Sequence, residues 1–447
     1  MGTREKAMRD LLVTAIVFGV LPFIFKRPWI GILLWSWLGY MNPHRQTWGF
    51  AYDFPFSLIT GLVTITAFFF SRDKKEFPWT RETVVLMIFL FWMLITTVFA
   101  FYSNLAWMQW DKVWKIQLMI FLTAMIIKER QQLHWMVWVI AVSLGYYGFK
   151  GGIFTILKGG EHRVWGPDGT FIGGNNEIAL ALVMAIPLIR YLHLQAERQW
   201  VRWGLASAMV LCGVAAMGSQ SRGALLAILA MAFFLWTKSR KKFITGIYLV
   251  IGLAIVAAVM PQSWYDRMNT IKTYEEDASA LGRINAWHTA FNVAKDRITG
   301  GGFEMFMAPT FSQYAPEPYR VHDAHSIYFE VLGEHGFVGL GLFLLLGLFA
   351  WLRARQIIRV CKNEPDLKWA SDLAAMIQVS LIGYAVGGLF LGLAYFDLPY
   401  HLVIILVLTA KFTGVLGQHA PAINPARNIQ LPHPSSRLDH EEATRRV

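Results

Sequence analysis

Charged residues and cysteines are both scarce in this chain. Asp, Glu, Lys and Arg make up 16% of its 447 residues, whereas 55% are hydrophobic, and the mean hydropathy is +0.41. Soluble domains of this length are rarely so apolar. Cys212 lies within an apolar run and Cys361 in a basic segment, so the two thiols belong at different depths. We therefore predict neither a disulfide nor a cysteine metal site.

Motifs for common soluble chemistry are absent as well. The chain has no Walker loop, no dinucleotide fingerprint and no G-x-S-x-G elbow, which leaves ATP, NAD and serine-hydrolase chemistry without support. No Asp-x-Asp pair lies in the polar segments expected on the outer face, and the acidic run 275–277 is typical of a solvated lead-in to a helix. We predict no cofactor.

Long apolar runs recur along most of the chain and predict an all-α, polytopic integral membrane protein. Lipid offers no hydrogen-bond partner to a backbone amide, and the runs approach the ~20 residues that a helix needs to cross a bilayer. They lack the alternation that a barrel strand requires. The clear runs are 56–70, 83–101, 113–127, 133–149, 178–192, 203–218, 223–236, 243–260, 337–352, 371–391 and 399–416.

Residues 11–41 are ambiguous because Lys26-Arg27-Pro28 interrupts them. They form either a hairpin or one broken crossing, and we favour the broken crossing, which gives about 12 transmembrane helices. No small-residue cleavage site follows, so we expect a retained anchor. Residues 1–417 then form a single transmembrane domain, 261–336 a large polar, helical loop inserted within it, and 418–447 a disordered cytoplasmic tail.

Basic residues predict the orientation, because they concentrate in alternate short loops and such loops stay in the cytoplasm. The basic positions are Arg72, Lys74, Lys75, Arg81, Lys128, Arg130, Arg198, Arg202, Lys238, Arg240, Lys241, Lys242, Arg353, Arg355, Arg359 and Lys362. The segments expected outside are 42–55, 102–112, 150–177, 219–222, 261–336 and 392–398. Positive loops on one face explain the net charge of +12 better than nucleic-acid binding does.

The polar segment 261–336 predicts two helices. Residues 279–297 read as a helix lying on the membrane, with an apolar stripe formed by Leu281, Ile284, Phe291 and Ala294. Arg283 and Trp287 are four residues apart, so they share a face and can stack as cation on ring. A second helix begins near Asp323 and runs into the next span, carrying His325.

His325 and Arg222 are the first candidates for chemistry. An imidazole titrates near neutrality, so His325 is either a general base or ligand for an acidic group, or a histidine bonded locally at a helix start. Arg222 opens a span from a short outer loop, where a guanidinium and a helix N-terminus together favour an anion; the alternative is an interfacial, snorkelling side chain. His322, three residues before His325, precedes the expected helix, and we predict no metal site.

The segment 150–177 supplies further candidates. It contains His162, Arg163, several glycines, and Asn175 with Asn176. Glycines let the backbone approach a ligand, and asparagine amides suit sugar hydroxyls. An ordinary turn-rich connector has the same composition.

The order of these features resembles the O-antigen ligase and polymerase superfamily of bacterial envelope glycosyltransferases. The similarity lies in Ser221-Arg222-Gly223 opening a span, Gly282-Arg283 with Trp287, the glycine turn 300–303, and Ala324-His325-Ser326 followed by Glu334-His335-Gly336. Ser326 stands where the family usually has Asn. The run 173–177 is similar to the ligase branch associated with exosortase systems.

The resemblance implies a GT-C-like, metal-independent, inverting glycosyltransferase in the bacterial inner membrane, with its active site facing the periplasm. The donor would be a glycan on undecaprenyl pyrophosphate, and the acceptor a sugar hydroxyl of lipid A–core, as in lipopolysaccharide biosynthesis. Arg222 and Arg283 would stabilise the departing pyrophosphate, and His325 would take the acceptor proton. Substrate contacts would come from His162, Arg163, Asn175, Asn176, Trp287 and His322.

Three other functions remain open at this point. An O-antigen polymerase and a protein O-oligosaccharyltransferase would use the same donor with a different acceptor. A transporter of lipid-linked glycan would also need many spans. We see no internal repeat and no paired broken helices of the kind that transporters use, and the cations and histidines in outer loops favour an enzyme.

Overall fold

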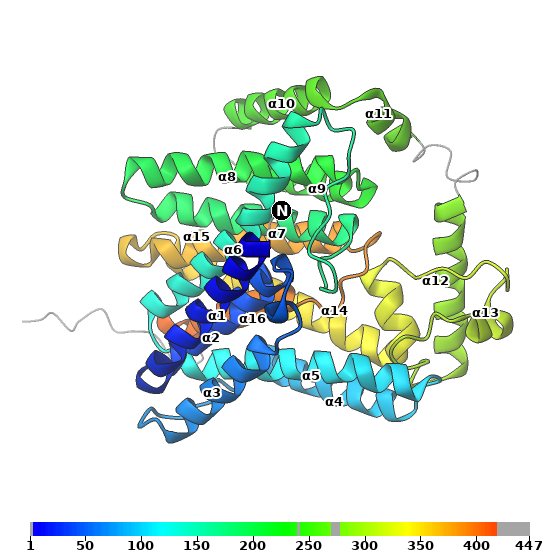
Figure 1. Ribbon diagram of the computed structural model, residues 1–447, viewed down its shortest axis with the longest axis horizontal. Coiled ribbons are helices and arrows are strands. Elements are labelled where there is room, and N and C mark those ends of the chain that lie inside the picture. Colours follow the sequence, from blue (N-terminus) through cyan, green and yellow to red (C-terminus); the bar gives the residue numbers. More distant parts are fainter. Residues whose placement is uncertain (1–2, 239–241, 270–277, 418–447) are drawn as a thin grey trace, which may run out of the picture.

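The computed structural model describes residues 3–238, 242–269 and 278–417, and every regular element in these ranges is a helix (Figure 1). The α-helices are α1 Thr3–Lys26, α2 Pro28–Met41, α3 Phe56–Phe70, α4 Arg81–Val98, α5 Ser103–Ile126, α6 Arg130–Leu157, α7 Asn175–Gln195, α8 Gln199–Gly218, α9 Arg222–Lys238, α10 Lys242–Val259, α11 Gln262–Asn269, α12 Ala278–Asp296, α13 Ala308–Tyr314, α14 Ile327–Cys361, α15 Lys368–Gly387 and α16 Asp397–Phe412. The all-α prediction is confirmed. The expected tail, 418–447, lies outside the described residues.

Seven helices in the described ranges are long and apolar enough to cross a membrane. They correspond to α1, α4, α6, α7, α8, α14 and α15, and the shorter apolar helices α3 and α9 accompany them. The chain is therefore a polytopic membrane protein. The total of about 12 spans stays a prediction.

The interpretation of residues 11–41 as one broken crossing is wrong. The helix breaks at Arg27, and α2 begins with Pro28 and returns beside α1 (Figure 1). Arg9 near the start of α1 lies over the Trp48 ring at 4.8 Å, and the Gly49 amide donates to Asp10 Oδ1 over 3.3 Å. The start of α1 and the segment after α2 thus share one end of the bundle, which is the geometry of a hairpin.

Helices α7 and α16 form the centre of the bundle. All residues of α16 from Asp397 to Ala410 are buried, polar positions included, and so is the run of α7 from Ile178 to Ala185. A helix that is apolar on all sides has no face suited to water or to partial exposure, so it is stable only when neighbours surround it. This arrangement lets the shorter α16 carry its flanking segment into the interior.

The loops predicted to be outside meet at one end of the bundle, which we call the loop end. Hydrogen bonds join Val164 N to Gly218 O over 3.1 Å, Phe101 N to Gly301 O over 2.8 Å, and Ile327 N to Gly388 O over 2.8 Å. Side-chain bonds add Gln46 to Tyr147 and Arg297 to Phe99 O. Segments far apart in sequence are thereby held together.

The polar segment contains the expected helix, α12, but a different face is packed. Gly282, Ala286 and Ala290 are among its buried residues, whereas Phe291 is 44% exposed. Small side chains let α12 approach α14 closely. Of the predicted stripe only Ala294 is buried, whereas Leu281, Ile284 and Phe291 remain partly or largely exposed. Figure 1 shows α12 at one edge of the bundle with α13 beside it.

A backbone contact between two glycine-containing turns positions the start of α14. The Gly301 and Gly302 amides donate to the carbonyls of Gly333 and Glu334 over 2.8 and 2.9 Å. Opposite them, Gly336 breaks α14 with φ 65°, and a Cβ there would lie 2.3 Å from Ile298 O. Only glycine combines this conformation with such close approach.

We predict that Gly302→Ala destabilises the protein. Its φ is 76°, and a Cβ there would lie 2.2 Å from Ala100 Cβ. The left-handed conformation costs an alanine roughly 1–2 kcal/mol, and the collision adds to that. Thermal unfolding in detergent should show a lower midpoint. Gly341→Ala is the matched control, because a Cβ at this helical position meets nothing within 4 Å; its midpoint should not fall. Equal stability of both variants would refute the proposed backbone contact.

Candidate functional site

The segment between α15 and α16, residues 388–396, is the point at which the candidate residues meet. Leu391, Leu393, Ala394, Tyr395 and Phe396 are all buried. A buried connection must have its backbone groups bonded, and here side chains from three helices supply the partners. Tyr384 and Tyr400 donate to the carbonyls of Leu393 and Ala394 over 3.0 and 2.7 Å.

Two carboxyl groups of α14 hold the same segment from the other side. Glu330 Oε2 accepts from the Ala394 amide over 3.3 Å, and Glu334 Oε2 accepts from the Tyr395 hydroxyl over 2.5 Å. The other Glu334 oxygen accepts from the Glu304 amide over 2.8 Å. These bonds tie the first two turns of α14 to segment 388–396 and to the turn after the three glycines.

His325 is in a loop and not on a helix, which corrects the expected helix start near Asp323. Helix α14 begins at Ile327, and His325 has a φ of 41°. A non-glycine residue in the left-handed region is strained, and such strain concentrates at functional sites. A Cβ on Gly392 would lie 3.9 Å from His325 Cα, so the backbone of segment 388–396 packs against this residue.

The His325 ring has polar neighbours and remains 29% exposed. Its Nδ1 lies 3.6 Å from Asp323 Oδ2, and its ring centroid is 5.2 Å from that of His322. Asp323 is itself exposed. An imidazole with Nδ1 toward a carboxylate presents Nε2 to the open side.

Burial lowers the pKa of His325, with further lowering from the charges of Arg283 and His322 and an opposing effect from Asp323. The imidazole is therefore neutral at pH 7 and able to accept a proton. Burial and the charge of Asp323 raise the pKa of Glu304 nearby. Acidic and basic groups at this end are thus shifted in the directions expected of a partly desolvated site.

Arg283 lies on α12 beside this histidine. Its NH1 donates to the Phe390 carbonyl over 3.4 Å, which joins α12 to segment 388–396. The predicted stacking of Arg283 on Trp287 is wrong. Trp287 instead stacks on Phe329, with ring centroids 4.8 Å apart at an angle of 7°, and its Nε1 donates to Ala324 O over 2.8 Å. Trp287 therefore supports the residue that precedes His325.

Arg222 is the first residue of α9. The Ser221 hydroxyl accepts from the Ala224 amide over 3.3 Å and caps the helix. The next residue, Gly223, faces segment 388–396, since a Cβ there would lie 3.0 Å from Leu391 Cγ. The backbone carrying Arg222 thus packs on the same segment as Arg283 and His325.

Two candidates from the preceding loop, Arg163 and Asn175, contact the turn directly before Arg222. Helix α6 continues to Leu157, so the connection is 158–174 and not 150–177. His162 and Arg163 are exposed, and Arg163 Nε donates to Gln220 Oε1 over 3.3 Å. Asn176 is partly exposed in the first turn of α7. Asn175 is buried and donates to Ser219 O over 2.9 Å, which differs from the expected sugar contact.

The sequence reasoning missed several residues of the site. Asp323 and Glu177 lie within electrostatic range of His325 and Arg283, respectively. Asp323 had a signal in its position between two histidines. Segment 388–396 had none, because it covers the end of the apolar run 371–391 and the start of the short outer segment 392–398 and contains no charged residue. Among the described residues, no group of three His, Cys, Asp or Glu side chains is placed to hold a metal ion.

An apolar cavity of about 240 Å³ begins two residues beyond His325. Ile327 and Tyr328 line its start, and it continues between α14, α15 and α16 past Phe343 and Leu346. Its lining suits a hydrocarbon chain. A polar site with a neutral imidazole and arginines therefore adjoins an apolar cavity at the loop end.

Two family models match the chain. Residues 8–197 match a family of unknown function (DUF5935), and residues 207–344 match the O-antigen ligase family (Wzy_C). Comparison with curated proteins finds no match. His325, Arg222 and Arg283 fall in the second match, whereas segment 388–396 lies outside both.

We predict that the pKa of His325 responds in opposite directions to its two charged neighbours. Arg283→Gln should raise it, because a cation that disfavours imidazolium is removed, and Asp323→Asn should lower it further. NMR titration of ring-labelled histidine would measure both, with His325→Gln identifying the resonance. Arg320→Gln, which removes a partly exposed arginine paired with Glu317, is the control and should leave the value unchanged. Shifts of the same sign would contradict the geometry.

Proposed function

The chain carries a domain of the O-antigen ligase family at residues 207–344, and we propose on this basis that it transfers a glycan from undecaprenyl pyrophosphate to a sugar hydroxyl of lipid A–core. Membership of this family and the apolar helices support a membrane-embedded, ligase-type glycosyltransferase. The specific donor, the acceptor and the periplasmic location are the proposal.

The observation that carries the proposal is the convergence of a neutral imidazole and two arginine-bearing helices on one buried segment. His325, Arg283 and the start of α9 all pack on residues 388–396. A diphosphate leaving group and an alcohol nucleophile need these two kinds of group together. A fixed cation stabilises the charge that develops on the phosphate, and a neutral base accepts the proton that the alcohol loses.

The reaction is a single displacement at the anomeric carbon. The acceptor oxygen attacks from the face opposite the pyrophosphate, the bond from carbon to phosphate oxygen breaks, and its electron pair leaves with the diphosphate. The acceptor proton passes to Nε2 of His325, because Nδ1 faces Asp323. One displacement inverts the configuration of the sugar.

Arginines are suited to the leaving group because they stay charged and bind phosphate oxygens through two parallel N–H donors. We assign this role to Arg222 and Arg283. The reaction needs no metal in this scheme. The apolar cavity that begins at Ile327 and Tyr328 is the proposed site of the polyprenyl chain nearest the anomeric carbon. His322, Arg163, His162 and Asn176 are the remaining candidates for contacts with phosphate or sugar.

Other acceptors are consistent with the same donor site. An O-antigen polymerase would extend a lipid-linked glycan, and a protein O-oligosaccharyltransferase would use a Ser or Thr hydroxyl. A transporter of lipid-linked glycan would need no base. Incubation of purified protein with lipid-linked glycan and each acceptor in turn separates these functions, because only one pair should give product.

We expect His325→Ala to lower glycan transfer in that assay roughly 100-fold or more, since a general base contributes this much to proton transfer. The variant should still insert into membranes. His288→Ala is the matched control, because His288 is an exposed histidine of α12 and should be dispensable. Near-normal transfer by the His325 variant would exclude it as the base.

Arg222→Lys tests whether phosphate is bound by two parallel donors. Lysine keeps the charge and loses the planar fork, so transfer should fall about tenfold or more. Measurement of kcat and KM with purified lipid-linked donor checks this. A variant with wild-type kinetics would show that charge alone is enough.

A further inference from the structure

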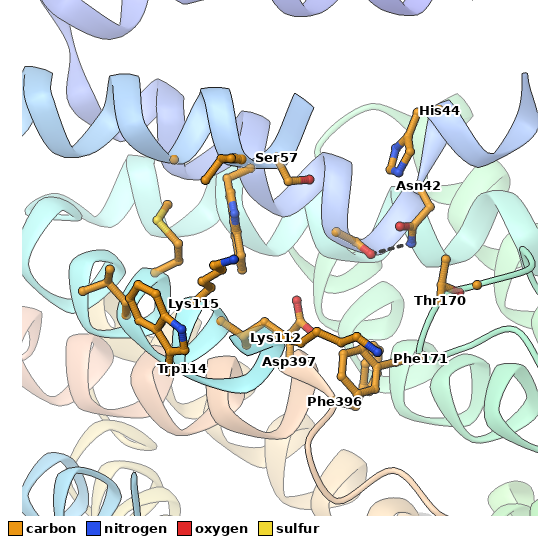
Figure 2. A pocket seen from close by; sticks show the side chains of 18 of the residues that line it. Asn42, His44, Ser57, Lys112, Trp114, Lys115, Thr170, Phe171, Phe396 and Asp397 are labelled. Carbon is orange, nitrogen blue, oxygen red and sulfur yellow. Dashed lines mark hydrogen bonds between the residues drawn. The ribbon is translucent and has the colours of Figure 1, made fainter. Parts of the chain in front are cut away.

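A second cavity, of about 720 Å³, lies between α2, α3 and α5 (Figure 2). Trp35, Leu62, Ile65 and Met119 are among its apolar wall residues. Leu58 and Leu62 line it and are 49% and 55% exposed, so the cavity opens sideways through α3. In a membrane protein, a lateral apolar opening of this kind gives a hydrocarbon chain access from the bilayer.

The end of the cavity nearest the loops is cationic. Lys112 and Lys115 extend into it from α5 (Figure 2). Arg45, from the segment after α2, also lines the cavity. Lys115 pairs with Asp111 at 2.6 Å and Arg45 with Asp53 at 3.2 Å, but both carboxylates are more than half exposed and such pairs are weak. Lys112 makes no ion pair with any described residue.

Two further polar groups face this end. Asp397 is a buried carboxyl of the wall, and its neighbour Phe396 is the last residue of segment 388–396. Burial, followed by the charge of Arg45, lowers the pKa of His44 to about 4, so this imidazole is neutral at pH 7. At this end of the cavity, the cations Lys112, Lys115 and Arg45 therefore outnumber the one buried carboxyl group, that of Asp397.

The apolar and cationic parts are arranged along the helix axes. From Lys112 to Met119 is seven residues, or roughly 10 Å along α5. The lysines occupy the loop end and the apolar side chains occupy the deeper part. An occupant that matches both parts must have an anionic head and a hydrocarbon chain.

We propose that this cavity binds a phosphate-bearing membrane lipid, with its phosphate at Lys112 and Lys115 and its chain between α2, α3 and α5. Ammonium groups bind phosphate strongly, whereas a carboxylate head would offer fewer acceptor oxygens. Lys112 has only the longer-range charge of Glu304 near it and no ion pair with a described residue, so a neutral lipid would supply no anion in contact with it. The site is built almost entirely from residues in the half of the chain that matches a family of unknown function.

This lipid site is separate from the apolar cavity beside His325. It does not rest on the proposed transfer reaction, since binding requires only the cavity and its lysines. If transfer does occur, the cavity would place a second lipid-anchored molecule at the same end of the bundle as the base. Phe396 and Asp397 line this cavity, and Phe396 ends the segment 388–396 on which His325 packs, so the chain directly connects the lipid site to the proposed reaction site.

A photoreactive dodecyl phosphate, with a diazirine at the chain end, tests the proposal on the full-length protein in phosphatidylcholine nanodiscs. Cross-links should fall in 61–65 and 116–119, the deeper walls. Lys112→Gln with Lys115→Gln should weaken labelling about tenfold, as expected for loss of charge-assisted contacts. Lys158→Gln, an exposed lysine at the same end, is the matched control and should label as wild type.

Gly61→Phe tests the chain-binding part independently. A Cβ at Gly61 has Met119 Sδ at 3.8 Å, so alanine fits there and a phenyl ring would enter the cavity. Gly61→Phe should abolish labelling of these walls, and Gly61→Ala should retain it. Both variants must first show unchanged helical circular dichroism and a single peak in gel filtration.

Three results would overturn the proposal. Equal labelling by the corresponding dodecanol probe would mean that phosphate is not recognised. Displacement of the probe by inorganic phosphate would mean that the site takes a free anion and not a lipid. Unchanged labelling of the double lysine variant would remove the assigned head-group contacts. His325→Ala should label normally, so that failure of transfer and failure of lipid binding are distinguishable.

Discussion

The hydrogen bonds between the first turns of α14 and segment 388–396 are the constraint on which the loop end depends. Glu330 and Glu334 accept from the Ala394 amide and the Tyr395 hydroxyl, and Ile327 N donates to Gly388 O. A buried carboxyl without a partner is costly, so these bonds determine where the segment runs. Arg283, Gly223 and His325 then pack on it.

The same segment explains how distant parts of the chain can act on one substrate. Arg222 begins one helix, Arg283 lies on another, and His325 precedes a third. Helices α12 and α14 also pack directly on each other, and the start of α9 joins them through residues 388–396. The left-handed conformation of His325 is held by this packing and by the glycine contact between 300–302 and 333–336. Preorganisation of this kind holds charged groups in place before the reaction begins.

The part of the chain that matches the O-antigen ligase family does not contain every residue of the candidate site. Residues 207–344 carry the candidate base and arginines, but the segment that positions them follows this match. Residues 8–197 supply the walls of the larger cavity between α2, α3 and α5. A glycan transfer between lipid-anchored molecules would need both a reactive centre and places for hydrocarbon, and the cavities lined by α2, α3 and α5 and by α14, α15 and α16 are suited to hydrocarbon.

The sequence by itself determined the helical membrane class, the approximate ranges of most apolar helices and the set of loops that share an end. These follow from local quantities: the length of apolar runs, the lack of alternation and the distribution of basic residues. It also singled out His325, Arg222 and Arg283 by residue type and order. Tertiary structure decided what local patterns do not contain. Residues 11–41 fold as a hairpin because the start of α1 contacts Trp48 and Gly49, and α12 packs through Gly282 and Ala286 because small residues allow close approach to α14. Segment 388–396 is held in the site by hydrogen bonds to residues about 60 positions away in the sequence. A local stretch of sequence does not indicate such distant partners.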